Sequence, residues 1–195
     1  MKRVSLFLMA ALLLTGAASA QTNVPAALQK KFPSLRVQPK VATKRDPVQG
    51  SFYMQKMTIT PSVIVEGAAT QPQGAMEATM LIIAMDTGAK YRERREIYKV
   101  HAAETIQIAA VDKAIKRELE FRPSKTQFDS YRDTSNVGGA VYKWYVFGLR
   151  DAETKQLLHF ETNCVPLQKH TASNPDGRSK FLALATGSLF DTEFK

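Results

Sequence analysis

The feature that most constrains the fold is the run Met80–Met85, in which every residue is apolar. Successive side chains of a β-strand point to opposite faces of the sheet, so such a run predicts a strand covered on both faces. The run closes a longer segment, Ala75–Met85, and is followed by the turn sequence Asp86-Thr87-Gly88. We therefore expect a sheet with a buried strand at its centre.

Strand-like patterns recur at hairpin spacing through most of the chain. The clearest hairpin joins Val141–Leu149 to Gln156–Thr162 through a polar loop, Arg150–Lys155. Further strands are expected at Ser51–Thr60, ended by Pro61, at Val63–Val65, at Tyr91–His101 and at Thr105–Ala109. The last apolar segment, Lys180–Phe190, has no clear pattern and receives no assignment.

One segment has a helical pattern. The apolar residues Val111, Ala114, Ile115 and Leu119 fall at helical spacing, and Asp112 could cap the first turn. This predicts a short helix over Val111–Leu119.

Seven or eight strands with one short helix favour a mainly β fold. We predict an immunoglobulin-like antiparallel β-sandwich, with an OB-like barrel as the rival. Trp144 would be the buried aromatic residue of a core strand. The immunoglobulin disulfide is absent, because Cys164 is the one cysteine of the chain.

The N-terminus has the pattern of an export signal. Lys2 and Arg3 precede the apolar run Val4–Leu14, and Ala18-Ser19-Ala20 forms a cleavage site before Gln21. The run is too short for a membrane span, which needs roughly 20 residues. We expect residues 1–20 to be removed, leaving an exported protein without a transmembrane anchor, in the periplasm or at the cell surface.

Residues 21–50 are basic and contain several prolines. Pro33, Pro39 and Pro47 should interrupt any long element, so this part is expected to be an irregular N-terminal arm. The sandwich domain would then occupy residues 51–195.

Basic residues outnumber acidic ones, 27 to 18. This excess favours contact with an acidic polymer such as a glycan or nucleic acid. The candidate contact residues are Arg92, Arg94, Arg95, Lys113, Lys116 and Arg117. Because glutamates are interleaved with them, the alternative is an ordinary solvated surface.

Cys164 is the one candidate nucleophile that the pattern suggests. Thr162 precedes it by two residues, as in sortase-like cysteine transpeptidases, and His101 or His170 could supply a base. The nearest downstream arginine, Arg178, is distant in sequence. The alternative is a small buried apolar side chain near the end of a strand.

Other catalytic and metal-binding patterns are missing. The three histidines are widely spaced, and there is no Gly-x-Ser-x-Gly, His-Glu-x-x-His or phosphate-binding glycine loop. The methionines lie mostly in strand-like segments, where they fill space in a core. We therefore expect no enzyme activity, no metal and no cofactor.

The order of these elements resembles a family of bacterial exported immunoglobulin-like proteins associated with type IV pilus-like machinery. The resemblance covers roughly residues 50–195 and rests on the strand Met76–Met85, the strand–helix unit Ile97–Leu119 and the hairpin Val141–Thr162. It implies a non-catalytic envelope protein that acts by protein–protein contact, and it assigns no site residues. Such contact would use an exposed sheet edge or an apolar face.

Overall fold

Strands make up most of the computed structural model, which describes residues 31–32, 35–67, 73–111 and 116–194. The strands are β1 (Arg36–Pro47), β2 (Met54–Glu66), β3 (Met76–Asp86), β4 (Tyr98–Ile108), β5 (Lys116–Glu120), β6 (Ser124–Asp129), β7 (Ala140–Asp151) and β8 (Leu157–Thr162). The helices are α2 (Thr87–Tyr91), α3 (Val165–Ser173) and α4 (Arg178–Leu182), with a 3-10 turn at Pro175–Gly177. None of the described helices is long and apolar enough to cross a membrane.

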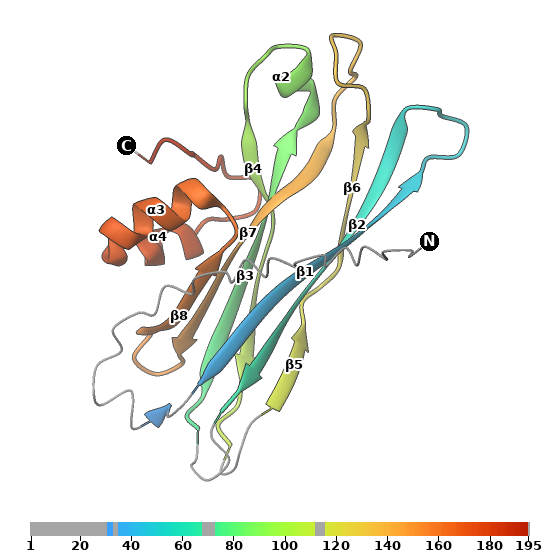
Figure 1. Cartoon of the computed structure of the whole chain (residues 1–195). Coiled ribbons are helices and arrows are strands. Elements are labelled where there is room, and N and C mark those ends of the chain that lie inside the picture. Colours follow the sequence, from blue (N-terminus) through green and yellow to red (C-terminus); the bar gives the residue numbers. More distant parts are fainter. Residues whose placement is uncertain (1–30, 33–34, 68–72, 112–115, 195) are drawn as a thin grey trace, which may run out of the picture.

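The strands form two antiparallel sheets that pack face to face (Figure 1). In the first sheet, β2 pairs with β1 on one side and with β5 and β6 in succession on the other. The second sheet has the order β4-β3-β7-β8. In the described residues one isolated bridge, Phe128 to Gly139, joins β6 to the segment before β7. The predicted β-sandwich is confirmed, and the arrangement is not a closed OB-like barrel.

Both faces of β3 are buried, as its apolar pattern predicts. Met76, Met80 and Ile82 lie in a core cluster between the two sheets. Leu81, Ile83 and Met85 lie in a second cluster on the opposite face. There α3, α4 and the C-terminal segment cover the sheet (Figure 1).

The predicted hairpin is also confirmed. β7 and β8 pair with Phe147 opposite Glu161, and the turn between them is closed by a bond from the Asp151 N–H to the Gln156 carbonyl. The buried Asp151 carboxylate accepts hydrogen bonds from the Lys31 ammonium at 2.9 Å and from the Thr154 hydroxyl at 2.7 Å. The N-terminal part of the described chain is thereby tied to this hairpin.

The helix predicted over Val111–Leu119 is wrong where the structure describes it. Lys116–Glu120 is strand β5, and Val111 forms an isolated bridge with Gln73. The capping residue, Asp112, lies outside the described residues. β5 forms because β2 offers it an open ladder edge, where Leu119 pairs with the fully buried Val63. A single inward apolar residue suffices on such an edge, so tertiary pairing overrides the helical spacing.

The prediction that prolines keep residues 21–50 irregular is wrong for Arg36–Pro47, which is strand β1. Proline lacks the N–H that a central strand must donate, but it is tolerated on an edge strand when its nitrogen faces away from the ladder. Pro39 pairs with Val63 and Pro47 with Gln55. Odd-numbered β2 residues direct their backbone groups away from β1, as the Phe121 N–H to Pro61 carbonyl bond shows. The backbone nitrogens of both β1 prolines therefore point away from the ladder with β2.

Pro61 does not end β2 as expected, and the reason differs from that for the β1 prolines. Along β2, the ladder with β6 covers Met54–Ile59 and the ladder with β5 covers Ser62–Glu66. Pro61 lies between the two ladders and accepts a hydrogen bond from the Phe121 N–H, so its missing N–H interrupts neither ladder.

The region after β3 also differs from expectation. Asp86-Thr87-Gly88 begins helix α2 instead of a tight turn, with the Asp86 carboxylate accepting from the Ala89 N–H at 3.0 Å. The strand expected from Tyr91 begins only at Tyr98. The unassigned segment Lys180–Phe190 contains the end of α4 and a short stretch that pairs with β4.

Gly139 should be indispensable for the fold. Its φ is +119°, and an added Cβ would lie 2.3 Å from the Gln127 carbonyl oxygen of β6. We expect Gly139→Ala to lower the free energy of unfolding by about 3 kcal/mol or more, because backbone strain and a backbone clash add. Gly50→Ala is the matched control: Gly50 also has a positive φ, +79°, but open space around it. Urea denaturation should show a much smaller loss for it, and equal losses would contradict this account.

Candidate functional site

Three connections lie together at one end of the sandwich, and we call residues 48–53, 87–97 and 130–139 the loop end (Figure 1). They are the β1–β2 turn, the α2 segment and the β6–β7 connection. The Thr87 N–H donates to the Gly139 carbonyl at 2.9 Å, which joins the α2 segment to the β6–β7 connection. The Ser130 N–H donates to the Tyr53 carbonyl at 2.9 Å, which joins the β6–β7 connection to the β1–β2 turn.

The β1–β2 turn holds a phenylalanine in solvent. The Ser51 N–H donates to the Val48 carbonyl at 3.1 Å, and the Met54 N–H donates to the Ser51 hydroxyl at 3.0 Å. Phe52 lies between these bonds at the outside of the turn and is 101% exposed. A large apolar side chain held in this way has no packing role in the isolated chain.

The half-buried Tyr53 follows Phe52 in the chain, and exposed apolar side chains lie in the β6–β7 connection. The Tyr53 and Tyr131 rings are stacked, with centroids 5.6 Å apart, and Val137 is 59% exposed. The buried Asp129 carboxylate orders this connection by accepting from the Tyr131 N–H at 2.8 Å and the Val137 N–H at 2.7 Å. Asn136 adds a side-chain bond to the Tyr131 carbonyl. The aromatic surface is therefore built on a rigid connection.

Three arginines of the loop end, Arg92, Arg94 and Arg95, follow helix α2, and Arg132 lies in the β6–β7 connection. Helix α2 ends at Tyr91 with Arg92 as its C-cap. Beyond the cap, the Arg95 N–H donates to the Ala89 carbonyl at 2.8 Å, and Arg94 has a left-handed conformation with φ 55°. Glycine usually occupies this position, because other residues are strained there. Arg94 is thus kept at a position where its backbone conformation is unfavourable.

The arginine-bearing segment has an excess of positive charge. It carries four basic and two acidic residues between positions 87 and 97. Glu93 pairs with Arg95 at 2.8 Å and with Arg92 at 3.7 Å, and Glu96 pairs with Lys90 at 2.7 Å. Among the described residues no carboxylate forms an ion pair with Arg94, whose charge is available to a partner.

The structure does not assemble the full set of predicted polyanion contacts. Arg92, Arg94 and Arg95 share the loop end, but Lys116 and Arg117 lie on β5, at the opposite end of the sandwich (Figure 1). The Lys116 ammonium pairs with Glu66 at 2.9 Å. Lys113 lies outside the described residues. A single basic surface that joins these residues is therefore not formed.

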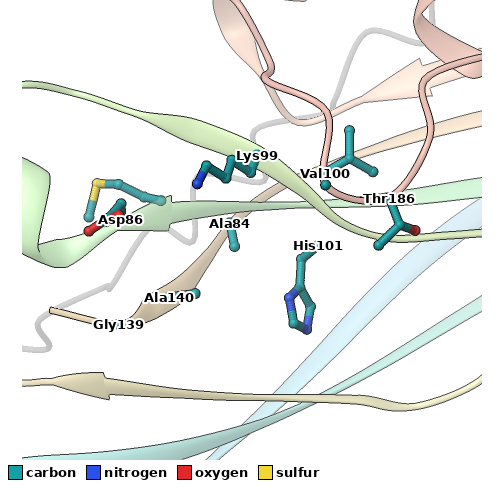
Figure 2. Close-up of a pocket in the computed structure, with 10 residues that line it drawn as sticks. Ala84, Asp86, Lys99, Val100, His101, Gly139, Ala140 and Thr186 are labelled. Atoms are coloured by element: carbon teal, nitrogen blue, oxygen red, sulfur yellow. The ribbon is translucent and has the colours of Figure 1, made fainter.

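A pocket of about 380 Å³ adjoins the loop end (Figure 2). Its lining combines the ends of β3, β4 and β7 with the segment before Leu189, and many of its residues are small: Ala84, Gly139, Ala140, Thr186 and Gly187. His101 points into the space below these strands (Figure 2). It is the extra residue of a bulge in β4, opposite Ile82 and Ile83.

The polar groups at this pocket are few, and some are already engaged. Burial lowers the pKa of His101, which a hydrogen bond to the Lys125 backbone only partly opposes, so the imidazole is neutral at pH 7. The Asp86 carboxylate is engaged as the cap of α2. Within the described ranges, no three His, Cys, Asp or Glu side chains gather as a metal site.

Cys164 does not lie at a site. It is 0% exposed in the second core cluster, and burial raises the pKa of its thiol. The histidines that could have activated it have other surroundings. His101 lines the pocket, whereas the His170 ring stacks on Phe194 with centroids 5.0 Å apart. The structure therefore favours the reading of Cys164 as a core residue.

The aromatic residues of the loop end were not singled out from the sequence. The pattern Ser51–Thr60 reads as one strand, which places Phe52 and Tyr53 within it. A signal was present, because Pro47, Gly50 and Ser51 are turn-favouring residues that lie close together immediately before Phe52. Tyr131 and Val137 lie in a polar connector that is ordered by Asp129 and Asn136. No local sequence pattern predicts this ordering.

No protein-family model matches the chain, and a search of curated proteins gives no match. Among solved structures, a calcium-binding mutant of Bacteroides uniformis beta-glucuronidase 2 is 16% identical over 63% of this chain, with a TM-score of 0.27. The chain spans 12% of the length of that glucuronidase chain. A structure from Akkermansia muciniphila is 9% identical over 68% of this chain and 73% of its own, with a TM-score of 0.31.

A structural genomics target is 14% identical over 67% of this chain and 86% of its own, with a TM-score of 0.27. Similarities at this level carry no argument about function.

The strain at Arg94 can be measured. We expect Arg94→Gly to raise the free energy of unfolding by about 0.5–1 kcal/mol, because glycine adopts a left-handed conformation without a steric cost. Arg92→Gly is the matched control, since Arg92 has φ −84° and removal of its side chain only adds backbone freedom. Thermal or urea unfolding should move in opposite directions for the two variants. A loss of stability in Arg94→Gly would contradict the strain.

Proposed function

We propose that this chain is a non-catalytic binding module of the cell envelope that acts by protein–protein contact through its loop end. The observation that carries the proposal is the fully exposed Phe52 beside the stacked Tyr53 and Tyr131 rings. The envelope setting rests on the predicted export signal, and a pilus-like assembly as its place rests on the resemblance in element order.

The composition of the loop end is that of a protein interface. Aromatic residues and arginine are enriched where proteins meet, and they supply most of the binding energy there. Burying a side chain such as Phe52 against a partner contributes about 1.5–3 kcal/mol. The arginines would fix the orientation of the partner through charge, and within the described chain neither Arg94 nor Arg132 forms an intramolecular ion pair.

The site is also prepared for binding. Asp129 and Asn136 hold the connection that carries Tyr131 and Val137, and Ser130 fixes it to the β1–β2 turn. A surface that is already ordered loses little conformational entropy on association. The proposal of a binding role, not a catalytic one, is further supported by the burial of Cys164.

Site-specific photo-cross-linking in the producing bacterium tests the proposal. A photoreactive residue in place of Phe52 should give a discrete cross-linked product with another envelope protein, because this side chain would be buried in the contact. The same residue in place of Val165, which is 54% exposed on α3, is the control and should give none. Adding Tyr131→Ser should weaken the product at position 52. Absence of a product there, or equal products at both positions, would overturn the proposal.

A second candidate, binding of an acidic polymer, is favoured by one observation: the loop end combines adjacent arginines with exposed rings. Such surfaces hold polyanions through charge and stacking. We expect the double change Arg94→Gln and Arg95→Gln to lower the salt concentration at which the protein leaves heparin or DNA columns. The double change Lys116→Gln and Arg117→Gln removes the same charge from β5 and should have little effect. No retention of the unchanged protein at low salt, or equal shifts, would exclude this candidate.

A further inference from the structure

The described sheet edges differ in their protection against pairing with another chain. An edge strand presents unpaired N–H and C=O groups, and proteins protect such edges with prolines, charges or short strands. β1 carries Pro39 and Pro47, and the five residues of β5 include four charges: Lys116, Arg117, Glu118 and Glu120. β8, at the other edge of the second sheet, has no proline but is only 6 residues long. In β4, the stretch Ala102–Ile108 has no proline and a single charged residue, Glu104.

Part of the β4 edge is already paired by the chain itself. The Val100 N–H donates to the Ser188 carbonyl at 2.9 Å, and the Gly187 N–H donates to the Val100 carbonyl at 2.8 Å. The pairing is antiparallel, with Leu189 opposite Lys99. It ends at Val100, and no described backbone segment pairs with the outer edge beyond it. This edge therefore accepts a strand over its first residues and leaves Ala102–Ile108 open.

The bulge at His101 decides which residues offer backbone groups along the open edge. Val100 pairs with Ile83, and the next pair joins Ala102 to Ile82. The extra residue shifts the alternation by one, so beyond the bulge Ala103, Thr105 and Gln107 direct their N–H and C=O groups outward.

A side-chain contact agrees with this alternation. The Thr105 hydroxyl hydrogen-bonds the Thr79 hydroxyl at 2.9 Å. Such a contact is typical of a pair whose backbone groups point away from each other, because side chains approach most closely there.

We propose that this edge pairs antiparallel with the same edge of a second copy of the chain, with Thr105 on the two-fold axis. In this register Ala103 lies opposite Gln107 of the partner subunit, and three facing pairs exchange six backbone hydrogen bonds. Glu104 lies opposite Ile106 of the partner subunit, so the two carboxylates do not face each other. The second sheets of both copies join into one continuous sheet.

A second copy fits this edge better than a strand of another protein. The edge is self-complementary, since reversing it places small or uncharged residues opposite one another at every position except Glu104. That carboxylate is engaged by the Arg122 N–H at 2.6 Å and offers little to select a charged foreign strand. Because the two β4 strands run antiparallel, the loop ends of the two copies point in opposite directions, which suits a module that bridges two partners.

Sedimentation equilibrium of the mature chain tests the proposal. The unchanged protein should be a dimer at high micromolar concentration, and Thr105→Lys should raise the dimer dissociation constant at least about tenfold, because two like charges then meet on the axis. Thr43→Lys places the same charge on the exposed edge strand β1 and should leave the dimer unchanged. Circular dichroism should show that both variants are folded.

A disulfide tests the register. Cα atoms of a hydrogen-bonded antiparallel pair are about 5.5 Å apart, which suits a disulfide. Thr105→Cys should therefore form a covalent dimer on mild oxidation, whereas Thr43→Cys should not. The native Cys164 is buried and does not compete. If the unchanged protein is a monomer, the proposal is overturned, and this holds even if the monomer binds a strand of another protein at β4. A Thr105→Lys variant with the same dimer dissociation constant as the unchanged protein would also overturn it.

Discussion

The burial of β3 on both faces is the constraint on which the rest of the structure depends. All residues from Ala78 to Met85 are buried, which requires a layer above and a layer below the strand. The first sheet supplies one layer. The other comes from α3, α4 and the C-terminal segment, which close over Leu81, Ile83 and Met85. β4 and β7 pair with β3 along nearly its whole length, so the positions of both follow from it.

The same strand explains how a loop end arises. β4 and β7 each insert an extra residue opposite β3, His101 and Lys143, between Ile82 and Ala84. Bulges bend a strand and increase its twist, and they are frequent beside functional sites. Beyond them the wall consists of small side chains such as Ala84, which leaves the pocket in Figure 2. The loop end begins where this altered ladder stops, at Asp86 and the start of α2.

The sequence predicts those parts of the fold in which a local pattern and its burial coincide. Met80–Met85 has no competing interpretation, and the aromatic-rich β7 is followed at once by its partner strand. Prediction from the sequence fails for Lys116–Glu120, because the local composition favours a helix. Its strand conformation depends on pairing with the edge of β2, which is distant in sequence. Pro61 misleads for the same reason, because its missing N–H costs nothing only where β5 and β6 abut. The loop end is predictable only in its arginines, since the exposure of Phe52 depends on hydrogen bonds within the turn.

Departures from local stability rules are informative when they gather in one place. In the described part of this chain, the most exposed large apolar residue (Phe52), one of the three non-glycine residues with a positive φ (Arg94) and a half-buried neutral histidine occur at or beside one end of the sandwich. Each opposes the stability of the isolated chain through a different physical effect, namely apolar hydration, backbone strain and burial of a polar ring. One shared structural cause does not account for all three, because the turn, the helix end and the bulge are separate elements. Stability of the chain alone leaves them unexplained. The proposed function would give them a common reason, because a surface maintained for contact with another molecule is not selected for stability alone.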